Sequence, residues 1–334
     1  MSKEIPIPQL TVDPELTSID KGVNRDEMYN KHNCFRDLDA TGVNIVIQDT
    51  GLDQDHPWVS KQTNSTSSID FVGDGKGDEA GHGTMVADLA TRYANGANVE
   101  MHKTIPGDSS KPYYDSFGVI LNNPEDYDVL VMSWQYPGYN DSRVNRLVDE
   151  IADKGIVPVA AAGNHEDEVG SPATADKCIS VGALEESGTS ITNFSSWDIE
   201  GKPDLGFGGI PEISAIGDSI IGANADQGDL GEEIDPKRTV SSGTSFSCPF
   251  VANLVADVVR RTEDPTVEDI LISLEETAVE IEETTKDGMG RVNSIKFAEE
   301  HTGQDIKSDK QRQQESTAFI LTYILNIFRK ILKS

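Results

Sequence analysis

The sequence is poor in cysteine and in basic residues. Its three cysteines, Cys34, Cys178 and Cys248, are an odd number, and their spacing matches neither a disulfide framework nor a zinc site. Lysine and arginine number 28 against 58 aspartate and glutamate residues, so the formal net charge is -30. No basic stripe offsets this charge, which argues against nucleic acid as a partner.

The start of the sequence also has no apolar run of signal-peptide length, because Pro6 and Pro8 interrupt the few apolar residues there. Together with the scarcity of cysteine, this predicts a chain that stays in a reducing cytoplasm. A surface of charge -30 repels itself unless concentrated salt screens it. We therefore expect a halophilic, archaeal host, with an ordinarily acidic protein as the alternative.

Short apolar runs alternate with helical patterns along the chain. The runs that predict strands are Val43–Asp49, Val99–Lys103, Asp128–Trp134, Ile156–Ala162 and Lys177–Ala183. Helical patterns cover His82–Arg92, Asp141–Lys154, Thr244–Arg261 and Thr266–Ile281. Several strand runs are apolar without alternation, which is typical of strands buried on both faces of a parallel sheet. The pattern predicts an α/β fold, namely a doubly wound, mostly parallel sheet with helices on both faces.

Three polar residues lie where these predicted elements begin or end. Asp49 ends an apolar run, His82 opens a helical pattern, and Ser245 lies at the start of another. A serine hydroxyl needs a base to take its proton and a third group to orient that base, and these residue types supply all three roles. Singly, each residue is equally well explained as a turn former, a helix-start residue or an N-cap. The order Asp, His, Ser differs from that of α/β-hydrolases and of chymotrypsin-like chains.

Four motifs in this order resemble those of the subtilisin-like (subtilase) serine peptidases. They are Asp49-Thr50-Gly51 with His56-Pro57, His82-Gly83-Thr84, Ala160-Ala161-Ala162-Gly163-Asn164, and Gly243-Thr244-Ser245 with Pro249. The resemblance covers roughly residues 40 to 260. It implies a subtilisin-like fold and a serine endopeptidase that hydrolyses peptide bonds in polypeptides through an acyl-enzyme, with no required cofactor.

The resemblance also assigns roles within the site. Ser245 is the nucleophile, His82 its base, and Asp49 the group that orients and stabilises the imidazolium. Asn164 donates its side-chain amide to the oxyanion, together with the backbone N–H of Ser245. Cys248 lies one helical turn beyond Ser245, where a thiol nucleophile or a buried packing residue are the alternatives.

In such peptidases an extended substrate pairs with an exposed backbone segment. The matching segment here contains Ser133, Trp134 and Gln135, where the family usually has Ser-Leu-Gly. The opposite wall of the first specificity pocket is assigned to the residues Ala161, Ala162 and Gly163. Because Trp134 and Gln135 depart from the family pattern, the shape of this pocket stays open.

Other departures concern helix packing and cation binding. Met85 and Phe250 replace histidines common in the family, and Asp88 and Asn253 stand where glycines are common. These four residues indicate a divergent member with altered helix packing. The acidic residues Asp70, Asp74, Asp78 and Glu79 leave open a structural calcium site or a solvated acidic loop, and no metal ligand set is assigned.

We divide the chain into an N-terminal arm (1–40), a catalytic domain (41–300), a polar linker (301–315) and a C-terminal amphipathic apolar helix (316–334). The arm resembles the short extension of intracellular family members, which implies an inhibitory segment that lies across the cleft. A disordered segment is the alternative. On the C-terminal helix, one stripe carries Thr322, Asn326, Arg329, Lys330 and Lys333. We expect this helix to tether the chain to the cytoplasmic face of the membrane, with a membrane span or packing against protein as the alternatives.

Two other functions share these motifs. A catalytically silent subtilase fold would bind peptides as an adaptor, although Asp49, His82, Ser245 and Asn164 are all present. An esterase or acyltransferase would use the same triad, because a triad does not specify amide over ester. The sequence does not give the physiological substrate, the activation step or the oligomeric state.

Overall fold

The computed structural model describes residues 38–105, 110–136, 140–198, 209–281, 286 and 288–302. Most of the predicted N-terminal arm and linker, and the whole C-terminal helix, lie outside these residues. Among the helices that are described, none has the length and apolar character needed to cross a membrane.

Seven parallel strands form the central sheet, in the order β2-β3-β1-β4-β5-β6-β7. Their bounds are β1 (Asn44–Asp49), β2 (Ser65–Asp70), β3 (Asn98–Lys103), β4 (Val129–Met132), β5 (Val157–Ala161), β6 (Ile179–Leu184) and β7 (Ile213–Ile216). β1 lies between β3 and β4, so the sheet has a switch point beside β1, as doubly wound sheets do. The predicted fold class is confirmed, and each predicted strand is present.

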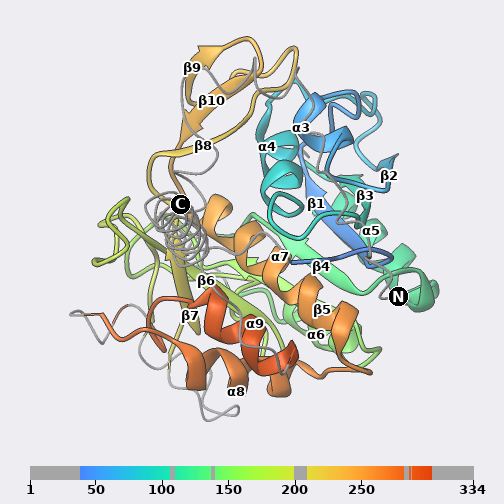
Figure 1. The fold of residues 1–334 in the computed structure, drawn as a ribbon. Coiled ribbons are helices and arrows are strands. Elements are labelled where there is room, and N and C mark those ends of the chain that lie inside the picture. The colour runs from blue at the N-terminus through green and yellow to red at the C-terminus, as the bar shows by residue number, and fades with distance from the viewer. Residues whose placement is uncertain are drawn as a thin grey trace, which may run out of the picture.

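Helices cover both faces of this sheet (Figure 1). One apolar cluster joins Ile45 and Ile47 of β1 to α4 (His82–Leu89), α7 (Thr244–Arg261), α8 (Val267–Thr277) and α9 (Ser294–Thr302). A second cluster joins Val46 of β1 to α5 (Lys111–Asn122) and α6 (Ser142–Ala152). Successive side chains of a strand point to opposite faces, so strands that are covered on both sides must be apolar throughout.

The sequence did not indicate several elements. β2 has a mostly polar sequence and is paired only with β3, at the edge of the sheet. A second, antiparallel sheet contains β8 (Ile220–Ala223), β9 (Glu232–Asp235) and β10 (Arg238–Ser241), and projects above α3 and α4 in Figure 1. Two short elements complete the fold, α3 (Pro57–Ser60) and the 3-10 helix η1 (Pro124–Asp126).

Helix α4 ends three residues earlier than predicted, at Leu89 instead of Arg92, because a side chain of α7 binds the backbone that follows. The side-chain oxygen of Asn253 accepts the backbone N–H groups of Tyr93 and Ala94, each at 2.8 Å. The Asn253 amide donates to the carbonyl oxygens of Ala90 at 2.7 Å and Ala94 at 3.1 Å. Asn253 is fully buried, so it supplies hydrogen bonds that a continued helix would have made.

The other departures from the family pattern attach α4 to its neighbours. Asp88 is buried, pairs with Arg92, and accepts the backbone N–H of Ala223 in β8 at 2.9 Å. Met85 lies so close to Gly222 of β8 that a Cβ on that glycine would come within 2.6 Å of the Met85 Cγ. On α7, the ring of Phe250 packs edge-on against that of Tyr93. The altered helix packing predicted from these residues is therefore a set of contacts joining α4, α7 and β8.

We predict that Asn253→Ala lowers the free energy of unfolding by about 3 kcal/mol, because it leaves several buried backbone groups without partners. The measurement is the denaturant midpoint at unchanged m-value, made in a Ser245→Ala background that removes the nucleophile expected from the sequence. Asn122→Ala removes an exposed asparagine whose amide binds its own helix, and is the matched control. Equal losses in the two variants would contradict the role of Asn253.

Candidate active site

The predicted site residues meet at the carboxyl ends of the central strands. Asp49 is the last residue of β1, and Ser133 and Asn164 follow β4 and β5. His82 is the first residue of α4, and Ser245 lies in the first turn of α7. Ligands of open α/β sheets bind at this edge, near the switch point.

Asp49 and His82 form a partly buried hydrogen-bonded pair. The Nδ1 of His82 lies 2.7 Å from the Oδ1 of Asp49, which also accepts the backbone N–H of Thr50 at 2.7 Å. The Asp49 side chain is 0% exposed and that of His82 is 21% exposed. A carboxylate can only accept, so Nδ1 of His82 carries the proton and Nε2 is left to act as a base.

A close contact between two motifs brings these side chains together. A Cβ on Gly83 would lie 2.2 Å from the carbonyl oxygen of Gly51 and 3.2 Å from the Cβ of Asp49. Any larger residue at position 83 would therefore force the start of α4 away from the end of β1. The backbone N–H of Gly83 also donates to the hydroxyl of Thr50 at 2.9 Å.

Asp78 stabilises the contact between the end of β1 and the start of α4, a role that the sequence did not reveal. Its carboxylate accepts from the hydroxyl of Thr50 at 2.8 Å, the backbone N–H of Gly81 at 2.9 Å, and the N–H and hydroxyl of Thr84, both at 2.7 Å. Burial raises the pKa of Asp78 above its usual range, against the effect of these hydrogen bonds. Its position four residues before His82 was a signal, but the surrounding acidic residues suggested a cation site or a solvated acidic loop instead.

The pKa of His82 is raised above the ordinary histidine value. Burial alone lowers this pKa, but the negative charge of Asp49 and its hydrogen bond outweigh burial, and Asp78 adds to the effect. The imidazolium that forms when His82 accepts a proton is therefore stabilised by the protein. This is the property required of a general base that becomes a general acid in the next step.

Ser245 is paired with the segment that follows β4. Its hydroxyl donates to the carbonyl oxygen of Ser133 at 3.0 Å, and the hydroxyl of Ser133 donates to the carbonyl oxygen of Ser245, also at 3.0 Å. The ring of the next residue, Phe246, lies 5.5 Å from the ring of His82. The Ser245 hydroxyl thus donates to Ser133 and not to His82 in this structure. Catalytic hydrogen bonds often form only with substrate bound.

Asn164 is oriented by Thr244, the residue before the nucleophile. The side-chain oxygen of Asn164 accepts the backbone N–H of Thr244 at 2.9 Å and its hydroxyl at 3.0 Å. That hydroxyl in turn accepts the backbone N–H of Gly163 at 3.0 Å. With its oxygen held in this way, the exposed Asn164 side chain has its NH₂ group available as a hydrogen-bond donor.

The two segments assigned to the first specificity pocket lie side by side, because β4 and β5 pair in parallel register. Ala161, Ala162 and Gly163 are buried, as is Ser133. Trp134 is 7% exposed and packs against the ring of Tyr113, with 4.3 Å between ring centroids. Trp134 therefore faces α5, and Gln135 is the residue of this segment that reaches Gly163.

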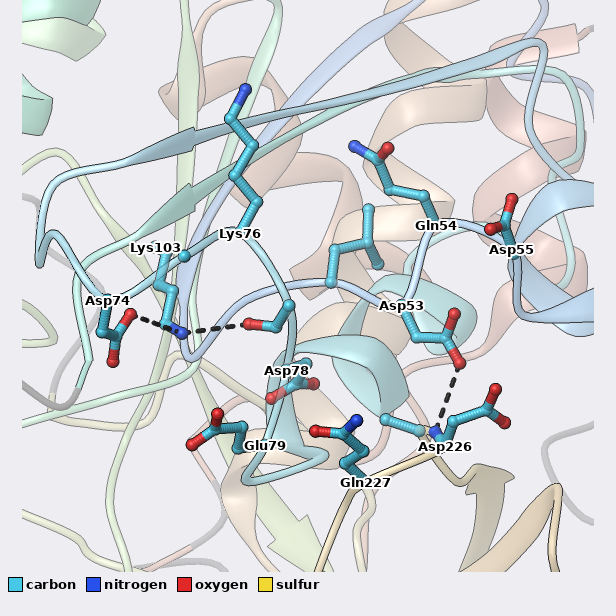
Figure 2. Close-up of a pocket in the computed structure, with 14 residues that line it drawn as sticks. Asp53, Gln54, Asp55, Asp74, Lys76, Asp78, Glu79, Lys103, Asp226 and Gln227 are labelled. Carbon is cyan, nitrogen blue, oxygen red and sulfur yellow. Dashed lines mark hydrogen bonds and ion pairs between the residues drawn. The ribbon is translucent and has the colours of Figure 1, made fainter.

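An acidic cavity of about 380 Å³ lies between the loop that follows β1 and the segment that follows β2 (Figure 2). Carboxylates of Asp53, Asp55, Asp74, Asp78, Glu79 and Asp226 line it, with Lys76 and Lys103. Asp74 binds Lys103 at 2.7 Å, and Asp70 accepts backbone N–H groups of the turn after β2. Within the described residues, no group of three or more His, Cys, Asp or Glu side chains is arranged to hold a metal ion.

The thiol of Cys248 is fully buried and donates to the carbonyl oxygen of Val159 at 3.6 Å. Burial raises its pKa well above the usual range for cysteine. A nucleophilic cysteine must form the thiolate, so this environment favours the packing role over the alternative nucleophile.

At one edge of a doubly wound parallel sheet, the structure brings together the Asp49–His82 pair, Ser245 and Asn164, which is the arrangement that the resemblance to subtilisin-like serine peptidases implies. The chain belongs to the subtilase family, whose family model matches residues 40–299.

Curated relatives are similar over about 70% of the chain. A subtilase-type proteinase, RRT12, from Saccharomyces cerevisiae is 27% identical over 260 residues, covering 72% of this chain and 49% of the relative. A subtilisin from a Bacillus species (strain TA39) is 27% identical over 263 residues, covering 69% of this chain and 60% of the relative. The chain thus spans about half to three fifths of the length of these relatives.

Solved structures share the fold. The structure of a lanthipeptide protease superposes with a TM-score of 0.66 at 20% identity, covering 82% of this chain and 90% of that one. A cold-adapted subtilisin-like serine proteinase superposes with a TM-score of 0.62 at 22% identity, covering 78% and 91%. These similarities establish the arrangement of strands and helices.

We predict that kcat/KM for peptide hydrolysis rises with pH through an apparent pKa above about 6.5, the ordinary histidine value, because His82 must lose its proton to act as a base. Asp49→Asn removes the charge that raises the pKa of His82, so NMR titration of this imidazole should then move below that value. Glu79→Gln, which removes an exposed carboxylate three residues before His82, is the control and should leave the profile in place. If the titration midpoint of the His82 imidazole did not change in Asp49→Asn, the assignment of Asp49 as the group that raises the pKa of His82 would be contradicted.

Proposed function

We propose that the chain is a serine endopeptidase that hydrolyses peptide bonds in polypeptides. The observation that carries the proposal is the 2.7 Å hydrogen bond between Asp49 and His82, with Asn164 oriented by Thr244 beside Ser245. Membership of the subtilase family and the proteinases among its relatives support the same reaction.

In this mechanism the Oγ of Ser245 attacks the substrate carbonyl carbon while Nε2 of His82 takes its proton. The tetrahedral oxyanion lies between the Asn164 amide and the backbone N–H of Ser245, which has no acceptor within the first turn of its helix. His82 then gives the proton to the leaving amine, and the C–N bond breaks to leave an acyl-enzyme. A water molecule, deprotonated by His82, hydrolyses the ester and restores Ser245.

The substrate backbone is expected to pair with Ser133–Gln135, the segment that continues β4 beyond the sheet. Main-chain pairing of this kind holds many sequences with similar affinity. It also places the scissile carbonyl beside Ser245, because the hydroxyl of Ser245 already binds the carbonyl oxygen of Ser133. Selection among substrates then depends on side-chain sites along the segment.

Serine chemistry is tested with Ser245→Ala, which should abolish hydrolysis of an unstructured protein and labelling by a fluorophosphonate. Because the triad acts as a unit, His82→Ala combined with Ser245→Ala should be little worse than the poorer single variant. Asn164→Ala should lower kcat by about 10²–10³-fold with little change in KM, a magnitude taken from the corresponding asparagine in subtilisin. Full activity of Ser245→Ala would refute the proposal.

We further propose, from composition alone, a salt-dependent cytoplasmic protein tethered to the membrane by residues 316–334. The net charge of -30 supports the first part, and the apolar and cationic pattern of the C-terminal segment supports the second. The full chain should lose helical signal on dialysis from molar to millimolar salt, and should sediment with anionic vesicles more than a chain ending at residue 310. Unchanged signal would refute the first part, and equal sedimentation the second.

A further inference from the structure

The side chain of Gln135 lies directly across Gly163. A Cβ on Gly163 would come within 2.0 Å of Nε2, 2.2 Å of Cδ and 2.3 Å of Oε1 of Gln135. The whole carboxamide therefore occupies the place that any side chain at position 163 would take. Gly163 has a positive φ of 114°, so glycine is favoured there by the backbone as well as by Gln135.

The carboxamide of Gln135 is buried without hydrogen bonds. Neither Nε2 nor Oε1 has a partner among the described residues, although both atoms are inaccessible to water. A buried amide without partners destabilises a folded protein, and such groups are uncommon in native structures. Gln135 thus holds an unused donor and an unused acceptor beside the catalytic residues.

The position of this amide relative to the nucleophile follows from the hydrogen bonds on either side. Two residues before Gln135, the carbonyl oxygen of Ser133 accepts from Ser245. One residue after Gly163, Asn164 provides the oxyanion donor. When the scissile carbonyl lies between Ser245 and Asn164, the side chain of the same substrate residue lies next to the gap between Ser133–Gln135 and Ala161–Gly163. The carboxamide of Gln135 lies across that gap, over Gly163.

We propose that Gln135 determines specificity by narrowing the first specificity pocket and selecting a short carboxamide side chain, that of asparagine, in the residue before the scissile bond. The inference rests on the proposed endopeptidase function. A substrate side chain can enter only when the Gln135 carboxamide shifts away from Gly163. A substrate carboxamide, which offers one acceptor and two donors in a plane, then pairs with the donor and the acceptor of Gln135. Leucine has the same number and branching of side-chain heavy atoms as asparagine but no polar atoms, so it would leave the Gln135 amide unpaired. Large aromatic side chains would have to displace Gln135.

Sites built to hydrogen-bond a substrate reject analogues that lack the polar group more strongly than apolar pockets reject a change of size. The discriminating comparison is therefore between two substrate residues, asparagine and leucine, whose side chains have the same number and branching of heavy atoms. A preference for small residues in general would instead favour alanine over both.

The experiment measures kcat/KM of the full-length protein on four peptides that differ only in the residue before the scissile bond, which is Asn, Leu, Ala or Phe. The wild type should cleave after Asn at least about tenfold better than after Leu, and least well after Phe. Gln135→Met keeps an unbranched side chain of similar length without the amide, and should remove the Asn preference with no gain on Phe. Gln135→Gly should open the site and raise cleavage after Phe at least about tenfold.

Fluorophosphonate labelling of Ser245, which needs no side chain in this site, shows whether each variant retains a folded catalytic centre. A labelled wild type that cleaves after Asn and Leu equally would overturn the assignment of Gln135. Variants that are labelled but keep the wild-type order of substrate preference would also overturn the assignment of Gln135. If Gln135→Gly does not fold, Gln135→Met alone tests the assignment. Absence of both labelling and cleavage in the wild type would overturn the endopeptidase function and this inference with it.

Discussion

The contact between Gly83 and Gly51 is the constraint on which the rest of the site depends. It brings the first turn of α4 against the end of β1, so that Asp49 and His82 lie at hydrogen-bonding distance. Asp78 holds this junction through Thr50 and Thr84. The pKa of His82 follows from the same contact, because the charge of Asp49 opposes the effect of burial only at short range.

Helix α7 connects the catalytic groups to the core. Its first turn carries Thr244 and Ser245, which bind Asn164 and Ser133 at the ends of the neighbouring strands. Eight residues beyond Ser245 on the same helix, Asn253 binds the backbone at the end of α4. The helix that presents the nucleophile therefore also fixes the helix that presents the base, and both are buried against the same face of the sheet. Side chains that look like departures from the family pattern keep this relative position.

Much of the fold could be predicted from sequence, because strands buried on both faces carry apolar runs that mark them. β2 was missed because it is a polar edge strand, and β8–β10 because their short segments have no long pattern. The end of α4 was placed too late, since the side chain that ends it comes from Asn253, more than 150 residues away. No local signal could have shown this.

By itself, the sequence determined the family, the parallel sheet and the identity of the candidate catalytic residues, because these depend on local motifs and on periodicity. Only the tertiary structure decided what surrounds them. It turned Asp78 from a candidate cation ligand into a buried support of the junction and directed Ser245 toward Ser133. It also laid Gln135 across Gly163, because parallel pairing of β4 and β5 brings together two segments almost 30 residues apart. Such contacts depend on the packing of distant segments, which no local pattern encodes.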